Sequence, residues 1–253
     1  MSDFRNGFSS AAPVTADMSV DAGLRSFMLG VYNKVALGLL VSAALAFITG
    51  SYPPVRDLMF NTAVFPDGVT RLTGYSLLGM IVAFAPLVVL LGSNFVMKNP
   101  TAATAGGLYW LIVALIGASL GTVVLVYTGA SVVQTFLITA AAFGAVSLFG
   151  YTTKKDLSGF GTFLIMGVIG LVIASLVNMF LQNGMMQLII SAAGVLIFAG
   201  LTAYDTQRLK MTYYQLGGNQ NAMGVATSYG ALSLYINFIN MFQFLLALFG
   251  GRR

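Results

Sequence analysis

The chain has 253 residues, of which 58% are hydrophobic and 8% are charged, and its net charge is +5. Soluble domains carry roughly 25% charged residues, so this composition excludes an ordinary water-soluble enzyme and indicates a protein embedded in lipid. The sequence has no Cys, His or Glu, which removes thiol nucleophiles, Ser-His pairs and the commonest metal ligands. We therefore expect a protein without enzymatic activity, without a resident cofactor and without a nucleic-acid partner.

Taken in chain order, residues 1–26 mix polar and apolar types, and we expect a flexible cytoplasmic tail because a signal peptide needs an apolar run after a basic start. Seven apolar stretches follow in residues 27–253, each near the length of about 20 residues that a membrane-spanning helix needs. The predicted spans are Phe27–Gly50, Tyr75–Met97, Ala105–Tyr127, Ser131–Gly150, Phe160–Leu181, Met185–Arg208 and Ser228–Phe249.

The spans are expected to be helices rather than strands of a barrel. A barrel strand alternates strictly over about ten residues, whereas the run from Leu188 to Phe198 and its counterparts are apolar on all sides. Gly117 and Gly121 lie four residues apart in the third span, a small-residue pattern that favours close helix packing over dimerisation. The sequence thus predicts an all-α integral membrane protein, and it leaves the oligomeric state open.

Basic residues set the expected orientation, because short cytoplasmic loops are rich in Lys and Arg. With the N-terminus in the cytoplasm, the inner segments hold Arg5, Arg25, Lys98, Lys154, Lys155, Arg208 and Lys210. The outer segments hold Arg56, Arg71, Arg252 and Arg253. Seven basic residues against four favour a cytoplasmic N-terminus and an external C-terminus, although the terminal Arg pair argues for the opposite orientation.

Two ionisable residues lie inside the predicted spans, where a charge is costly and is often functional. Lys34 is two turns into the first span and has a long side chain, so we expect it to reach the membrane interface. The short side chain of Asp205, near the cytoplasmic end of the sixth span, needs a partner or water. Pairing with Arg208 at i+3 and a functional role in the membrane are equally good interpretations of Asp205.

Four polar residues share one face of the seventh span because they are spaced by four, three and three positions: Ser233, Asn237, Asn240 and Gln243. A helix surrounded by lipid would not carry such a stripe. The stripe predicts that this helix is enclosed by the others. It either forms hydrogen bonds to neighbouring helices or lines a conduction path.

Three segments resemble a known family. Tyr204-Asp205-Thr206-Gln207 ends the sixth span, Ala231 to Asn240 (ALSLYINFIN) lies in the seventh, and Lys154 to Ser158 (KKDLS) connects the fourth and fifth. Together these segments resemble the Bax-inhibitor-like (transmembrane BAX inhibitor motif) family, in particular its bacterial branch. The resemblance covers all seven spans and is most specific in the last two.

The resemblance implies a bundle of seven helices with the seventh at the centre, between two layers of three. It also implies a pH-sensitive calcium leak in the bacterial inner membrane, gated by two acidic residues. The first acid corresponds to Asp205 and the second to Asn237. A basic latch at the cytoplasmic end of the second helix corresponds best to Lys98.

Asn237 is a departure from the family pattern, since it replaces the second carboxylate by an amide. Two adjacent carboxylates cannot both ionise cheaply, which gives the family pair its pH response. Asp205 with Asn237 has one titrating member, and it offers calcium a single carboxylate where this cation prefers several. We therefore expect a weak calcium site and a weak or acid-shifted pH response.

Two classes of function remain open from the sequence, and a third, a proton-coupled transporter, has little support because the chain shows one buried acid and no clear inverted repeat. The first is a cation leak gated at Asp205, with calcium as the permeating ion. The second is a regulatory protein that binds another membrane protein, for example a membrane protease, through residues 1–26 and a long loop predicted at Lys210–Thr227. Calcium flux through the purified protein in vesicles separates the two classes.

Overall fold

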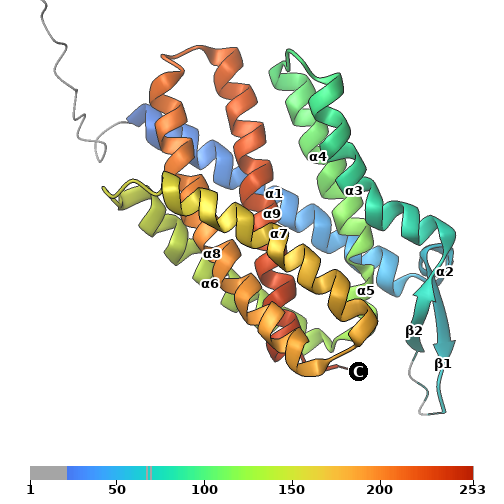
Figure 1. Ribbon diagram of the computed structural model, residues 1–253. Helices are drawn as coiled ribbons and strands as arrows, with labels where there is room; N and C mark the ends of the chain where they lie inside the picture. Colours follow the sequence, from blue (N-terminus) through green and yellow to red (C-terminus); the bar gives the residue numbers. More distant parts are fainter. Residues whose placement is uncertain (1–21, 67, 69, 253) are drawn as a thin grey trace, which may run out of the picture.

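The structure, a computed structural model, describes residues 22–66, 68 and 70–252. Most of the predicted tail lies outside the described residues, and residues 22–26 already belong to the first helix. The described helices are α1 (Ala22–Ser51), α2 (Pro53–Met59), α3 (Leu77–Val96), α4 (Ala102–Ser119), α5 (Gly121–Val126), α6 (Gly129–Thr152), α7 (Ser158–Leu181), α8 (Gly184–Gln215) and α9 (Gln220–Phe249) (Figure 1). The described strands are β1 (Phe60–Val64) and β2 (Thr70–Tyr75).

Helices begin where the sequence places short polar breaks. Thr128, Asn183 and Asn219 each precede a helix, and each side chain accepts a hydrogen bond from a backbone N–H of the first turn. Such caps satisfy donors that have no partner inside the helix. The polar breaks at these three positions therefore fix the starts of α6, α8 and α9.

The last helix, α9, lies at the centre of the bundle. It packs against α1 and α4 on one side and against α6 and α8 on the other. Two outer helices complete the layers, α3 on α4 and α7 on α8 (Figure 1). In the most apolar part of α9, 56% of the residues are buried, against 17–39% in the other candidate spans. The expectation of a central seventh span agrees with this packing.

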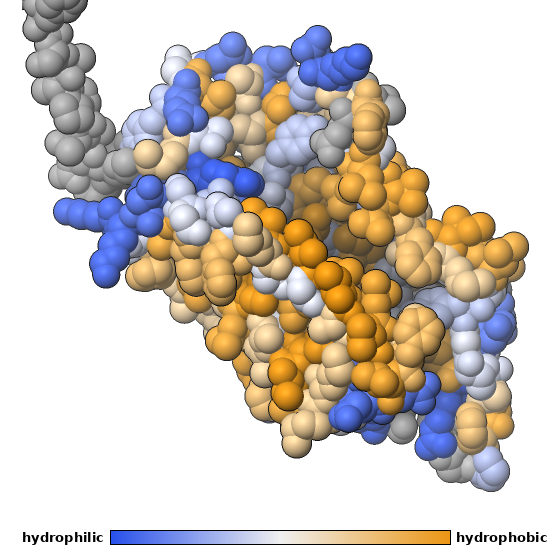
Figure 2. All heavy atoms as spheres, viewed as in Figure 1, coloured by the Kyte–Doolittle hydropathy of each residue, from blue (hydrophilic) through white to orange (hydrophobic). Residues whose placement is uncertain are grey.

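Among the described residues, six helical segments are long and apolar enough to cross a membrane: α1, α4 with α5, α6, α7, α8 and α9. The remaining predicted span corresponds to α3, whose apolar part, Leu77–Ser93, is shorter, and which contains Pro86. The count of seven spans is therefore not confirmed. Figure 2 shows hydrophobic side chains over the middle of one face, with hydrophilic side chains gathered toward its ends, as expected for a protein in a bilayer.

A β-hairpin between α2 and α3 was not expected from the sequence. β1 pairs with β2 in antiparallel register from Phe60 with Tyr75 to Val64 with Thr70, with an irregularity after Asn61. Gly68 in the connection has a positive φ of 75°, a conformation that favours glycine. The hairpin lies at the same end of the bundle as the C-terminus (Figure 1).

The prediction of a long loop at Lys210–Thr227 is wrong. α8 continues to Gln215 and α9 begins at Gln220, so the connection is only residues 216–219. Gly217 and Gly218 both take positive φ values there, which lets the chain reverse within these few residues. The polar residues on either side stay helical beyond the apolar part of each span.

Gly117 and Gly121 bring α1 into close contact with α4 and α5. A methyl group added at Gly117 would lie 2.6 Å from the Cα of Ser42, and one at Gly121 would meet the hydroxyl of Thr49. Ser42 and Thr49 in turn donate hydrogen bonds to the backbone carbonyls of Val113 and Ala118. The glycine pair therefore serves helix packing inside the chain, as predicted.

Candidate functional site

The candidate site lies where the cytoplasmic-facing half of α8, as predicted from the loop charges, meets the middle of α9. These two helices are antiparallel neighbours with extensive contacts. A close approach is possible because Gly230 and Gly194 carry no side chain where Leu209 and Phe244 press against them. Asp205 and Asn237 are both buried in this interface, at 7% and 5% exposure.

Asp205 has two polar partners among the described residues. The Nδ2 of Asn237 donates a hydrogen bond of 2.8 Å to its Oδ2 atom. The guanidinium of Arg208, one turn along the same helix, lies 2.9 Å from its Oδ1 atom. Each carboxylate oxygen thus has its own donor, which is what burial of a charged carboxylate requires. The structure places the two residues that the family pattern pairs in direct contact.

Arg208 connects the carboxylate to the surface. Its guanidinium also lies 3.4 Å from the hydroxyl of Ser233 and 5.6 Å from the ring centre of Tyr204. The Arg208 side chain is 48% exposed, whereas that of Asp205 is 10% exposed. The basic partner can therefore move into water, while the acid cannot follow it without movement of the helices.

Lys98 is not one of these partners. It follows the end of α3, is exposed, and in the described part of the chain the ion pair of Asp205 is made by Arg208. Lys34, which was expected to reach the membrane interface, has partners on two neighbouring helices. Its Nζ donates to the Ser228 hydroxyl on α9 at 2.7 Å and lies 5.4 Å from the centre of the Tyr109 ring. Lys34 therefore turns inward and ties α1 to the central helix.

The polar stripe of α9 divides into two halves. Ser233 and Asn237 bond to side chains of α8. The Nδ2 of Asn240 instead donates to the backbone carbonyl of Ile236 on its own helix at 2.8 Å, and Gln243 is exposed. Interhelical hydrogen bonding thus accounts for the half of the stripe nearest Arg208.

The YDTQ segment is attached to the loop between α6 and α7. The side-chain amide of Gln207 donates to the carbonyl of Lys155 at 2.7 Å and accepts from the backbone N–H of Leu157 at 2.8 Å. Within that loop, hydrogen bonds from Ser158 lower the pKa of the exposed Asp156 carboxyl below its usual value. Two of the segments that carry the family resemblance therefore form one structural unit.

Lys210 belongs to the same unit and was missed as a site residue, because it fell in the predicted loop. It is 7% exposed, and its ammonium donates to the carbonyl of Tyr151 at the end of α6 at 2.6 Å. The sequence did offer a signal for this contact. Lys210 follows Asp205 by five residues, on a helix that continues past both of them.

Calcium would find few ligands at Asp205. No three acidic, His or Cys side chains come together within the described residues. A calcium ion takes six to eight oxygens and favours carboxylates, whereas this site offers one carboxylate, the side-chain oxygen of Asn237 and nearby hydroxyls. The donor set therefore fits tight binding of calcium poorly.

Comparison with known proteins places the chain in a family. The family model described as "Inhibitor of apoptosis-promoting Bax1" matches residues 24–253. An uncharacterized protein of Caulobacter vibrioides is 64% identical over 254 residues, covering 100% of both chains. Protein RP147 of Rickettsia prowazekii is 40% identical over 92% of both chains. The inner membrane protein YbhL of Escherichia coli K12 is 41% identical over 92% of this chain and 94% of YbhL. The chain is therefore an integral membrane protein of the Bax-inhibitor-like family.

Proposed function

We propose that this protein is a slow cation leak of the bacterial inner membrane, closed by the contact between Asp205 and Arg208. The observation that carries the proposal is a buried carboxylate in a membrane bundle, whose basic partner within the described residues, Arg208, is half exposed. The location is proposed from the similarity to YbhL, which is named an inner membrane protein. We propose that the N-terminus is cytoplasmic, which puts the loops next to Asp205 on the cytoplasmic side.

The charge balance of the site explains the closed state. With Arg208 in place, the carboxylate is neutralised and offers little attraction to an entering cation. When the guanidinium moves into water, a buried negative charge is left, and a low-dielectric interior strongly favours its compensation by another cation. Arg208 and the permeating cation thus compete for the same carboxylate, at the Oδ1 atom that Arg208 holds in the closed state.

The permeating cation is proposed to be calcium, in line with the family resemblance. A leak needs a site that attracts the ion but releases it readily. One carboxylate with an amide neighbour meets this requirement better than a cage of carboxylates, which would retain calcium. Asn237 also keeps the Asp205 side chain in place, because its amide donates to the oxygen that Arg208 leaves free.

The test is calcium influx into vesicles that contain the purified protein and a trapped calcium dye. Arg208→Gln removes the competing charge and should raise the initial rate about fivefold, since an ion pair with one exposed partner is worth on the order of 1 kcal/mol. Lys98→Gln is the matched control, because Lys98 is exposed and does not contact Asp205. It should leave the rate unchanged.

A second variant tests whether the faster influx of Arg208→Gln depends on the Asp205 carboxylate. Asp205→Asn combined with Arg208→Gln should return the rate to the wild-type level or below. A larger effect of Lys98→Gln than of Arg208→Gln would assign the latch to Lys98. An absence of flux in every variant would refute the leak and favour the regulatory class of function.

A further inference from the structure

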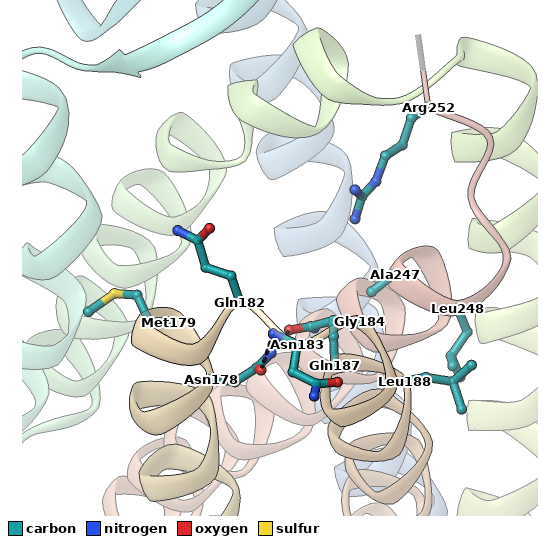
Figure 3. A pocket seen from close by; sticks show the side chains of 10 residues that line it. All are labelled: Asn178, Met179, Gln182, Asn183, Gly184, Gln187, Leu188, Ala247, Leu248 and Arg252. Carbon is teal, nitrogen blue, oxygen red and sulfur yellow. Dashed lines mark hydrogen bonds between the residues drawn. The ribbon is translucent and has the colours of Figure 1, made fainter.

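A second polar site lies at the opposite end of the bundle, beside the C-terminus. A pocket of about 460 Å³ opens between the turn joining α7 to α8 and the end of α9. Its volume is in the range of pockets that hold small ligands. The residues that line it are Asn178, Met179, Gln182, Asn183, Gly184, Gln187, Leu188, Ala247, Leu248 and Arg252 (Figure 3).

The floor of the pocket is a fixed network of amides. The buried Asn178 donates to the side-chain oxygen of Gln187 at 3.1 Å and accepts from the backbone N–H of Asn183 at 3.1 Å. Gln187 donates in turn to the hydroxyl of Ser191 at 3.3 Å. These bonds hold the amides in one arrangement, so their remaining donors are in place before a ligand arrives.

Arg252 provides the charge of the pocket. Its backbone is held by a bridge to Tyr127, and the preceding Gly251 bonds to Thr128 and Ser131. From this anchor the guanidinium is directed into the space above the amide floor (Figure 3). None of the described residues that line the pocket is acidic. An anion is therefore the ligand that the pocket favours, and a divalent cation is excluded by the guanidinium and the lack of carboxylates.

Gln182 shapes the rim. It takes a left-handed backbone conformation with a φ of 50°, where glycine is the residue usually favoured. Its side chain rises from the end of α7 (Figure 3), and Gln182 lines the pocket together with Arg252. A glutamine at this position adds an amide donor that glycine could not supply.

The apolar residues that line the pocket indicate which kind of molecule carries the anion. Met179 and Leu188 line the pocket, and both are more than half exposed on the outer faces of α7 and α8. In a bilayer these faces contact acyl chains, while the pocket lies at the helix ends, at the depth of lipid headgroups. A guanidinium binds phosphate through two parallel hydrogen bonds. We propose that this pocket binds a phosphate group, presented by a phospholipid, with Arg252 as its main donor.

The experiment is a thermal-unfolding titration of the whole protein in a neutral detergent, read by intrinsic tyrosine and tryptophan fluorescence. Dioctanoyl phosphatidylglycerol should raise the midpoint in a saturable way, because a ligand of the folded state stabilises it. Dioctanoyl glycerol, which has the same acyl chains without phosphate, should not. Inorganic phosphate is the third ligand: if it alone produces the same saturable shift, the phosphate site stands and its source is the free anion.

Variants assign the binding to the pocket. Arg252→Gln should raise the half-saturating lipid concentration about tenfold, as expected for a lost hydrogen bond to a charged group. Arg252→Lys should have a smaller effect, because the charge stays and the paired donors are lost. Gln182→Gly should also weaken binding while relieving the backbone conformation, so it tests the pocket even if a change at Arg252 impairs folding.

Arg56→Gln is the matched control, because Arg56 follows α1 at the same end of the bundle and pairs with the exposed Asp57. It should leave binding unchanged. Equal losses in the Arg56 and Arg252 variants would show general surface attraction and overturn the proposal. Equal stabilisation by the lipid and by dioctanoyl glycerol, or no saturable effect of any phosphate, would overturn it as well.

Discussion

Replacing Asn237 by Asp restores the second carboxylate of the family pattern and gives the sharpest test of the gate. The amide nitrogen of Asn237 lies 2.8 Å from an oxygen of Asp205, so the new carboxylate would face the old one directly. Two like charges about 4 Å apart repel by about 4 kcal/mol at an effective dielectric constant of 20, which is roughly three pH units of proton affinity. Arg208 offsets part of this repulsion.

The sign of the expected response follows from the charges. At low pH the variant pair shares a proton and carries one negative charge, as the wild-type site does. As pH rises the proton leaves, and the second charge holds Arg208 more tightly. Calcium influx through the Asn237→Asp variant should therefore be higher at pH 6 than at pH 8, by about tenfold. The wild type should show a weaker dependence across the same range.

The assay is calcium influx into vesicles at fixed calcium and varied pH, with a pH-insensitive trapped dye. Asn240→Asp is the matched control, because Asn240 is one turn along α9 and donates to the backbone carbonyl of Ile236 instead of to Asp205. The Asn240→Asp variant should keep the pH profile of the wild type. Asp205→Asn should remove the pH response both from the wild type and from the Asn237→Asp variant. A wild type as steeply dependent on pH as the variant, or an equal response of Asn240→Asp, would refute the reasoning.

Two further predictions concern packing and orientation. Gly117→Ala should lower the free energy of unfolding in detergent by about 1–3 kcal/mol, because the added methyl meets the backbone of Ser42 at 2.6 Å. Gly107→Ala, in the same helix with nothing within 4 Å of the added methyl, should be neutral or stabilising by up to about 1 kcal/mol; equal effects of the two changes would contradict the packing account. A reporter active only in the cytoplasm should work when fused at Lys155 and fail at Gly129, and the opposite result would reverse the proposed orientation.

The helices were predictable because long apolar runs have few alternatives in a membrane. The ends of the helices were harder to predict. Hydropathy marks where the lipid-facing surface stops, whereas a helix can continue into water, as α8 does through Lys210 to Gln215. The hairpin of Phe60–Val64 and Thr70–Tyr75 was missed because its short, mixed strands carry little periodic signal.

The site was predictable to the extent that it is local in sequence. The contact between Asp205 and Arg208 follows from their spacing on one helix. The pairing of Asp205 with Asn237 followed from the family pattern. Contacts that depend on how helices rotate against each other could not be predicted. Gln207 reaches the loop at Lys155, and Lys34 reaches Ser228 on α9, for reasons that lie in the packing of the whole bundle.

The central position of α9 has a consequence for biogenesis. The helices that surround it, α1, α4, α6 and α8, are all synthesised before it. Until α9 is inserted, the ammonium of Lys34 and the carboxylate of Asp205 lack their partners on that helix, Ser228 and Asn237. The early helices therefore form an incomplete bundle in the membrane, and the polar groups that face the position of α9 gain these partners only when the last helix is in place.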